Sequence, residues 1–215
     1  MGGLISHVKI LAFELSSGQG SVALLEDGAV LFEHSFPNDR KDSGTFFGNV
    51  QLCLKNFSAP GRIVVGLGPG SYAGVRIAIA TAIGLRTAVG AKLFGIPSIC
   101  ALDVEEKDYC VIGDARRQSF FFARVKGGRA VEGPILMTAA ELEARIPDAA
   151  TPIFTSEQLP QFPSAKLAYP TAGRLPALAR AYPDEIDDTR PLEPIYLREP
   201  HITVPKQPRV PAPTK

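Results

Sequence analysis

The sequence has almost no excess of charge of either sign. Its 215 residues include 23 Lys and Arg against 22 Asp and Glu, which gives a formal net charge of +1. This balance creates no large field that would steer the chain toward nucleic acid or an anionic membrane, so it disfavours a stand-alone clamp on an RNA backbone. Hydrophobic residues make up 45% and charged residues 21% of the chain, a globular composition that excludes intrinsic disorder.

Cysteine is scarce as well. Cys53, Cys100 and Cys110 are separated by 47 and 10 positions, spacings that fit neither a C-x-x-C metal knuckle nor a redox pair. Three is also an odd number for a disulfide framework. We therefore expect three buried thiols in a reducing compartment.

Long apolar runs are missing. No run reaches the ~18–20 residues of a membrane span. Residues 1–10 carry His7 and Lys9 but neither a long apolar segment nor a small-residue cleavage site, so we expect no signal peptide. These observations predict a soluble, cytoplasmic protein.

Several catalytic patterns are absent from the sequence. His7, His34 and His201 are isolated and form neither H-x-x-x-H nor H-E-x-x-H, which leaves a zinc hydrolase without support. Ser71 lies in GPGSYAG, which is offset from the G-x-S-x-G elbow of acyl-enzyme hydrolases. We expect no metal site and no acyl-enzyme nucleophile.

The first half of the chain predicts a mixed α/β unit. Short apolar runs bounded by turns indicate strands, Asp27-Gly28 is a hairpin signal, and Ser43 or Thr45 is placed to cap a helix. We expect strands at residues 8–13, 21–25, 29–36, 62–66 and 93–96, and helices at about 45–56 and 75–89.

The second half restarts in the same way, with a strand, a polar turn and another strand, which suggests an internal duplication. Thr138 and Glu141 have the spacing of a helix capping box. We expect strands at residues 109–113, 119–125, 151–155 and 194–198, and a helix at 175–182. The predicted division is a first lobe at 1–103, a reduced second lobe at 104–200 and a flexible tail at 201–215.

The most informative feature is a glycine-rich turn between a strand and a long apolar helix, here called the glycine turn (Gly66–Gly74). Such a turn can present backbone N–H groups to an anion, or it can serve only to let helix and sheet pack closely. Neither a Walker A nor a dinucleotide G-x-G-x-x-G pattern fits it. The weak candidates for anion or nucleotide binding are Glu14, Ser16, Gly68, Gly70, Ser71, Asp114 and Arg116. Local turn chemistry and an Asp114–Arg116 pair are the alternatives.

Four segments of the chain resemble the TsaB (YeaZ) family. Residues 68–77, GPGSYAGVRI, resemble its GPGSFTGVRIG signature. Residues 14–17, ELSS, resemble its D-T-S/T turn, and residues 114–116, DAR, its D-A-R turn. Residues 193–198, EPIYLR, resemble its late E-P-x-Y-L-R segment. The resemblance covers about residues 8–200.

The resemblance implies an α/β fold of the actin/Hsp70/sugar-kinase-like (ribonuclease H-like) class, with two related lobes and a reduced second one. It also implies a non-catalytic subunit, without a cofactor of its own, in the synthesis of N6-threonylcarbamoyladenosine on tRNA. The implied partners are a TsaD-like catalytic subunit and a TsaE-like ATPase, with tRNA reached only through the complex.

In that family the partner surface lies on the first-lobe helices. The residues that match it here are Phe46, Phe47, Val50, Leu54, Val75, Arg76, Ile79 and Ile83. Small residues let helices approach closely, so the second helix suits an interface, which could also form a homodimer. The alternative is that this helix is buried entirely within its own lobe.

Two departures from the family weaken the case for a nucleotide site. Glu14 stands where the family has Asp, and Asp42-Ser43 stands where it often has His-Ser. The rival functions are an independent ATP-dependent enzyme of the sugar-kinase-like class and an RNA-binding module.

Overall fold

The computed structural model describes residues 8–38, 43–146, 151–181 and 191–198, and these residues form two five-stranded sheets. The first sheet contains β1 (Lys9–Glu14), β2 (Gln19–Glu26), β3 (Ala29–Pro37), β4 (Arg62–Gly66) and β5 (Lys92–Ile96) in the order β3-β2-β1-β4-β5. β1 pairs antiparallel with β2 and parallel with β4. The predicted Asp27-Gly28 hairpin joins β2 and β3, and both residues have the positive φ that this turn needs.

The second sheet repeats this topology. It contains β6 (Asp108–Asp114), β7 (Phe120–Lys126), β8 (Arg129–Met137), β9 (Ile153–Thr155) and β10 (Lys166–Leu167) in the order β10-β9-β6-β7-β8. β6 pairs antiparallel with β7 and parallel with β9, as β1 does with β2 and β4. The two halves, which begin with similar sequence patterns, therefore also share the same strand order. The predicted two-lobe α/β fold is confirmed.

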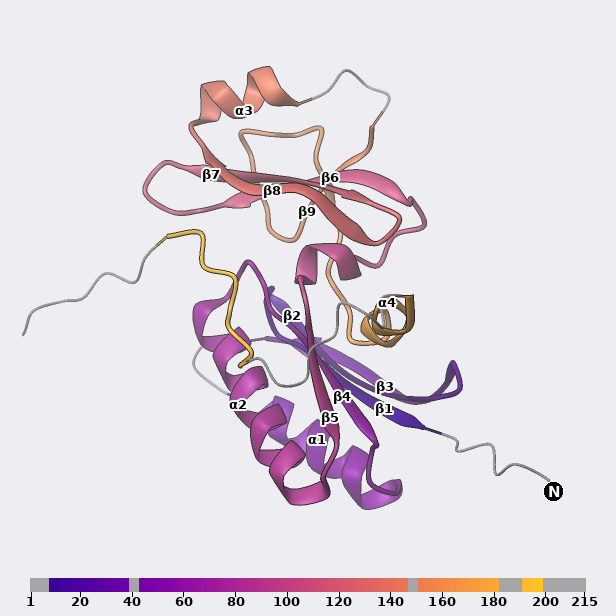
Figure 1. Cartoon of the computed structure of the whole chain (residues 1–215). Helices are drawn as coiled ribbons and strands as arrows, with labels where there is room; N and C mark the ends of the chain where they lie inside the picture. The colour runs from indigo at the N-terminus through magenta and orange to yellow at the C-terminus, as the bar shows by residue number, and fades with distance from the viewer. Residues whose placement is uncertain (1–7, 39–42, 147–150, 182–190, 199–215) are drawn as a thin grey trace, which may run out of the picture.

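The helices show why the second lobe is smaller. They are α1 (Gly44–Asn56), α2 (Tyr72–Val89), α3 (Ala139–Arg145), α4 (Leu175–Ala181) and the 3-10 helix η1 (Ser98–Ala101). α2 connects β4 to β5, whereas the equivalent connection between β9 and β10 consists of turns at residues 156–165. α1 and α2 lie together on one face of the first sheet (Figure 1).

Alternation along β1 divides the core into two layers. Leu11 and Phe13 face α1 and α2, whereas Ile10 and Ala12 belong to a cluster that also takes residues from the second sheet and from α4. α4 comes late in the chain, within the predicted second lobe, yet it packs on β1, β4 and β5 of the first sheet. The inner layer is therefore a core shared by the two halves.

Four sequence-based boundaries need correction. β8 was not predicted, because this edge strand is mostly exposed and lacks the apolar pattern of a buried one. Residues 194–198 form an extended segment rather than a strand, and only Ile153–Thr155 of the run 151–155 is a strand. α2 begins at Tyr72 instead of Val75, because the Ser71 side chain accepts a hydrogen bond from the Gly74 N–H and caps the helix there.

Other local predictions are confirmed. Thr138 and Glu141 form the predicted capping box at the start of α3. The three cysteines are buried and free, and burial raises the pKa of Cys53 and Cys100 to about 11. The predicted tail at 201–215 lies outside the described residues.

The length and mean hydropathy of α2 (1.2 over 18 residues) would allow it to cross a membrane, and no other described helix shares this property. In the structure, Val75, Ala78, Ile79 and Ala82 of this helix are buried against the first sheet.

Candidate functional site

The glycine turn packs its backbone directly onto the turn that follows β1. The Ser71 N–H donates to the Ser16 carbonyl at 2.6 Å. A Cβ atom on Gly70 would lie 2.0 Å from that same carbonyl oxygen, and one on Gly74 would lie 2.1 Å from the Leu15 oxygen. These glycines are therefore required for a close backbone approach. Of the two roles that the sequence allowed for the glycine turn, anion binding or close packing, this contact supports packing.

Glu14 lies beneath this contact and not in an open site. Its side chain is fully buried, and its Oε1 accepts from the Ser16 N–H at 2.7 Å, which fixes the turn. The opposite side of the carboxylate lies against Gly66, where a Cβ would be 1.7 Å from Oε2. Desolvation raises the pKa of Glu14, and the nearby groups of Ser16 and Ser98 lower it to a lesser degree.

The equivalent turn of the second lobe is built on Asp114. Its Oδ1 accepts from the Arg116 N–H at 2.6 Å, just as Glu14 accepts from Ser16 two residues later. The Arg116 guanidinium donates to Oδ2 at 2.8 Å, so the two side chains pair as the turn-chemistry alternative predicts. Glu157, at the end of β9, accepts from the Asp114 N–H at 2.8 Å and anchors the turn from a neighbouring strand.

This second turn also carries backbone strain. Arg116, Arg117 and Gln118 have φ angles of 66°, 53° and 59°, three successive non-glycine residues in the left-handed region. Each such residue costs about 1–2 kcal/mol in that conformation. The bonds at Asp114 and the Ser119 N–H to Arg116 carbonyl bond hold the turn in place.

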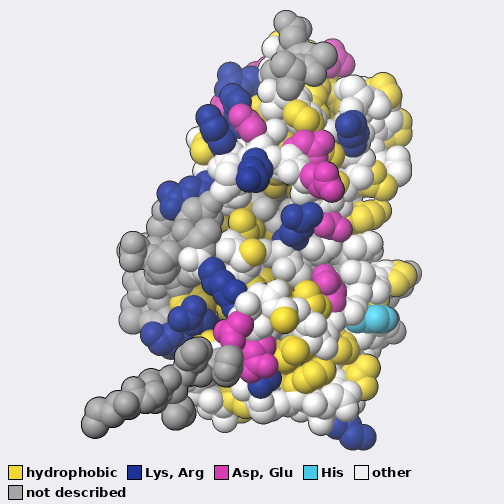
Figure 2. Space-filling model, turned by 90° about the vertical axis from the view of Figure 1, so that its right-hand side faces the viewer, with side chains coloured by type: hydrophobic (Ala, Val, Ile, Leu, Met, Phe, Trp, Pro, Cys, Tyr) yellow, Lys and Arg dark blue, Asp and Glu magenta, His cyan; other side chains and the backbone are white. Residues whose placement is uncertain are grey.

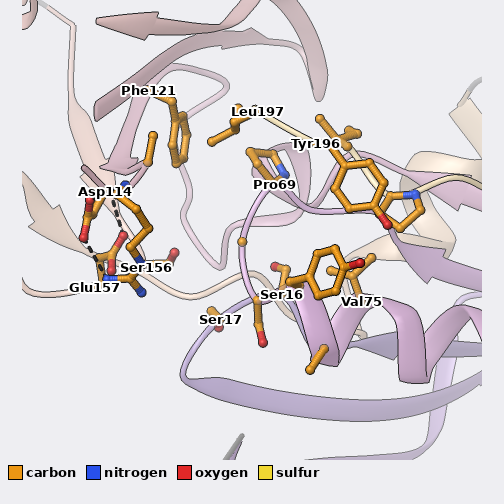
Figure 3. A pocket seen from close by; sticks show the side chains of 18 of the residues that line it. Ser16, Ser17, Pro69, Val75, Asp114, Phe121, Ser156, Glu157, Tyr196 and Leu197 are labelled. Atoms are coloured by element: carbon orange, nitrogen blue, oxygen red, sulfur yellow. Dashed lines mark hydrogen bonds and ion pairs between the residues drawn. The ribbon is translucent and has the colours of Figure 1, made fainter. Parts of the chain in front are cut away.

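A cleft of about 490 Å³ lies between the two turns (Figure 3). Five of the sequence candidates line it: Ser16, Gly70, Ser71, Asp114 and Arg116. Glu14 and Gly68 are not among its lining residues. Glu14 is therefore ruled out as a candidate for anion or nucleotide binding, because it is fully buried and does not line the cleft.

The polar groups of the cleft are largely occupied by partners within the protein. The Ser71 and Gly74 amides, which could have faced an anion at the start of α2, bond to the Ser16 carbonyl and to the Ser71 side chain. The guanidinium of Arg116 is held by Asp114, and Glu157 adds a second carboxylate to the same wall. This arrangement favours a structural role for the two turns over the binding of a phosphate group.

Sequence reasoning missed three residues that shape the cleft. Asn38 donates from its side-chain amide to the Leu15 and Ser17 carbonyls at 3.0 and 2.8 Å, and so completes the first turn. Glu157 and Tyr196 also line the cleft. No local pattern marks Asn38 or Glu157, because each acts on a strand end far away in the sequence.

The outer surface of α1 and α2 is the second candidate site. Phe47, Leu52 and Ile83 are large apolar side chains that are 48%, 49% and 46% exposed. Gly48 and Gly84 lie on the same outer surfaces, and a Cβ on either would meet nothing within 4 Å. We call these five residues the outer helix face.

Five of the eight predicted partner residues do not reach this face. Phe46, Val50, Val75 and Ile79 are buried in the core between the helices and the first sheet, and Leu54 packs against that core. Their assignment to a partner surface is corrected, because the sheet takes the inner side of each helix. Phe47, Arg76 and Ile83 remain exposed.

The face shown in Figure 2, which carries α4 in Figure 1, has basic side chains interspersed with acidic ones. On that side the described residues form no uninterrupted basic surface of the kind that binds an RNA backbone.

Comparison with known proteins agrees with the two-lobe fold described above. Residues 53–159 match the family model of TsaD, described as tRNA N6-adenosine threonylcarbamoyltransferase. A structure of YeaZ from Pseudomonas aeruginosa aligns with a TM-score of 0.70 and 24% identity, covering 88% of this chain and 100% of that one. Another structure, of an uncharacterized Pseudomonas aeruginosa protein with similarity to peptidase YeaZ, gives a TM-score of 0.72 over 89% of this chain and 100% of that chain, at 24% identity.

The family model and the two YeaZ-like structures are consistent with the resemblance to the TsaB (YeaZ) family. Mycobacterial relatives support the sequence kinship: an uncharacterized protein of Mycobacterium leprae is 33% identical over 64% of this chain, and one of Mycobacterium tuberculosis is 31% identical over 64%. The chain spans 38% of the length of the first relative and 64% of the second. In this structure, the GPGSYAGVRI segment that resembles the TsaB signature forms the end of the glycine turn and the start of α2.

Proposed function

We propose that this chain is a non-catalytic subunit that docks on a TsaD-like catalytic partner through its outer helix face, and so supports threonylcarbamoyl transfer to tRNA. The choice of a TsaD-like partner follows from the resemblance of the chain to the TsaB (YeaZ) family. A TsaE-like ATPase joins the pair, and tRNA is reached only through the complex, in the cytoplasm.

The two glycines of the outer helix face carry this proposal. A glycine inside a helix costs about 1 kcal/mol relative to alanine. Elsewhere in α2 that cost is explained by contact, since Gly74 touches the Leu15 backbone, but Gly48 and Gly84 have open space where a Cβ would be. A bare backbone flanked by Phe47 and Ile83 allows another helix to pack closely, with apolar side chains on either side of the contact.

The experiment replaces the two glycines and measures association. Gly48→Leu and Gly84→Leu should each weaken binding to the TsaD-like chain of the same organism by about tenfold or more, because the added side chain separates the helices. Isothermal titration calorimetry measures the affinity. Ala140→Leu, at an exposed position of α3, is the matched control and should bind normally.

Reconstitution tests the non-catalytic role. Transfer to tRNA should need both chains, and this chain alone should show none. The proposal is wrong if the lone chain performs the transfer, or if both leucine variants bind the partner as tightly as the unaltered chain. Without its partner the same face could pair two copies of the chain, which the same variants would keep apart.

The ATP-dependent enzyme alternative makes the opposite prediction. It requires saturable micromolar binding of Mg-ATP in the cleft and turnover that is lost in Asp114→Ala. The internally bonded amides of Ser71 and Gly74 argue against it.

A further inference from the structure

The described part of the chain ends with an extended segment, here called the strap (Leu192–Arg198), that crosses from the first lobe to the second. Leu192 packs against the core beneath α1 and α2, and Leu197 packs against the inner core shared with the second sheet. Between these two anchors, Ile195 and Tyr196 pass over the glycine turn and line the cleft (Figure 3).

The strap makes one backbone bond to the glycine turn. The Ile195 N–H donates to the Leu67 carbonyl at 2.8 Å. The other bonds of this part of the turn come from inside the first lobe: the Leu67 N–H donates to Ile96, and the Gly68 N–H to the Ser98 hydroxyl. The strap thus supports the turn from the outside, from a segment far away in the sequence.

An aromatic contact extends this support to α2. The Tyr196 ring lies 5.6 Å from the ring of Tyr72, the first residue of α2. The Arg76 guanidinium lies 4.6 Å from the centre of the Tyr72 ring and also bonds to its hydroxyl. Because Arg76 is one turn further along the exposed side of α2, the chain of contacts runs from the cleft to the side of α2 that carries Ile83 and Gly84.

We propose that the strap is a brace that positions the first turn of α2 and thereby links the cleft to the outer helix face. Tyr196 is the positioning residue, since it touches both the cleft and Tyr72. Both tyrosines remain about half exposed, at 50% and 42%, so their ring contact can separate while Leu192 and Leu197 stay packed on the core. This inference rests on the proposed function for its second consequence, the effect on partner binding.

The first measurement is hydrogen exchange on the full chain without a partner. Tyr196→Ala should speed amide exchange in residues 67–76 by about five- to tenfold, because local opening becomes easier, and should leave β6 unchanged. Tyr196→Phe keeps the ring and should behave like the unaltered chain. Glu193→Ala, an exposed change on the same segment, is the matched control.

The second measurement is affinity for the TsaD-like partner, which Tyr196→Ala should weaken by a similar factor. Ile195→Pro removes the N–H donor to Leu67, together with the Ile195 side chain and the freedom of its φ angle, and should reproduce both effects. Unchanged exchange in residues 67–76 in both variants would overturn the brace, and faster exchange with unchanged affinity would overturn the link to the helix face.

The two proposals fail separately. If the glycine variants of the outer helix face bind the partner normally, the proposed function falls, while the exchange result still decides whether the strap braces the turn.

Discussion

Glu14 and Asp114 occupy equivalent positions in the two repeats but meet opposite environments. Each ends the first strand of its sheet and accepts from the N–H two residues further along. Glu14 is sealed under Gly66, whereas Asp114 lies at the cleft and holds the Arg116 guanidinium. The same carboxylate-to-amide turn is therefore fully buried in the first lobe, whereas in the second lobe its carboxylate forms an exposed ion pair.

The burial of Glu14 predicts a pH dependence of stability. Its pKa is raised above the usual 4.5 by desolvation, so the folded state binds the proton more tightly than the unfolded state. The stability that this protonated group contributes is present below pH 4.5 and is lost as the pH rises through the folded-state pKa. Glu14→Gln, which cannot ionise, should lose less stability over that interval.

Urea unfolding of both proteins between pH 4 and pH 8 measures the difference. As the pH rises, the unaltered chain should lose free energy of unfolding relative to Glu14→Gln, so the difference between the two proteins should shift in favour of the variant. Every other titrating side chain is common to both proteins, so a constant difference across the range would contradict the buried acid.

At the scale of the element, α2 uses glycine for two different reasons. Near its start, Gly74 permits contact with the Leu15 backbone, while Gly84, near its end, has no neighbour within 4 Å of a Cβ position. The start of α2 therefore needs its glycine for packing within the fold, whereas the glycine near its end lies in the part of the helix that we propose contacts a partner.

Alanine substitution at these two glycines should give opposite signs. Gly74→Ala should destabilise the chain by about 2–4 kcal/mol, because the new methyl group collides with backbone that cannot move aside. Gly84→Ala should stabilise it by about 0.5–1 kcal/mol through helix propensity alone. Chemical denaturation measures both, and destabilisation by Gly84→Ala would contradict the open space seen at that position.

At the scale of the whole molecule, the two lobes share one hydrophobic layer. Val64 from the first sheet, Val111 and Phe121 from the second, and Leu175 from α4 all belong to one buried cluster. Each half also has a buried cluster of its own, but because α4 returns to the first sheet after the second has been formed, the inner layer is completed only when both halves are in place.

This shared core predicts a single cooperative unfolding transition. Val64→Ala and Val111→Ala, one in each sheet, should each lower the same melting transition, at a cost of about 1–3 kcal/mol. Differential scanning calorimetry should give a calorimetric enthalpy close to the van't Hoff enthalpy. Two separate transitions, each sensitive to only one of the substitutions, would show that the lobes fold independently.

The sequence by itself determined what depends on neighbouring residues: the hairpin at Asp27-Gly28, the capping box at Thr138 and the glycine segment that resembles the TsaB signature. These patterns work because turn geometry and helix caps are satisfied within a few residues. The duplication was visible for the same reason, since each copy begins with its own strand and turn.

Only the tertiary structure decided which side of each element is covered. α2 is apolar almost all round, so its sequence could not tell that Val75 and Ile79 face the sheet while Ile83 stays exposed. Nor could it place Glu157 beside Asp114, or the strap over Leu67. Such contacts join residues far apart in the chain, and they are fixed by packing rather than by local backbone preference.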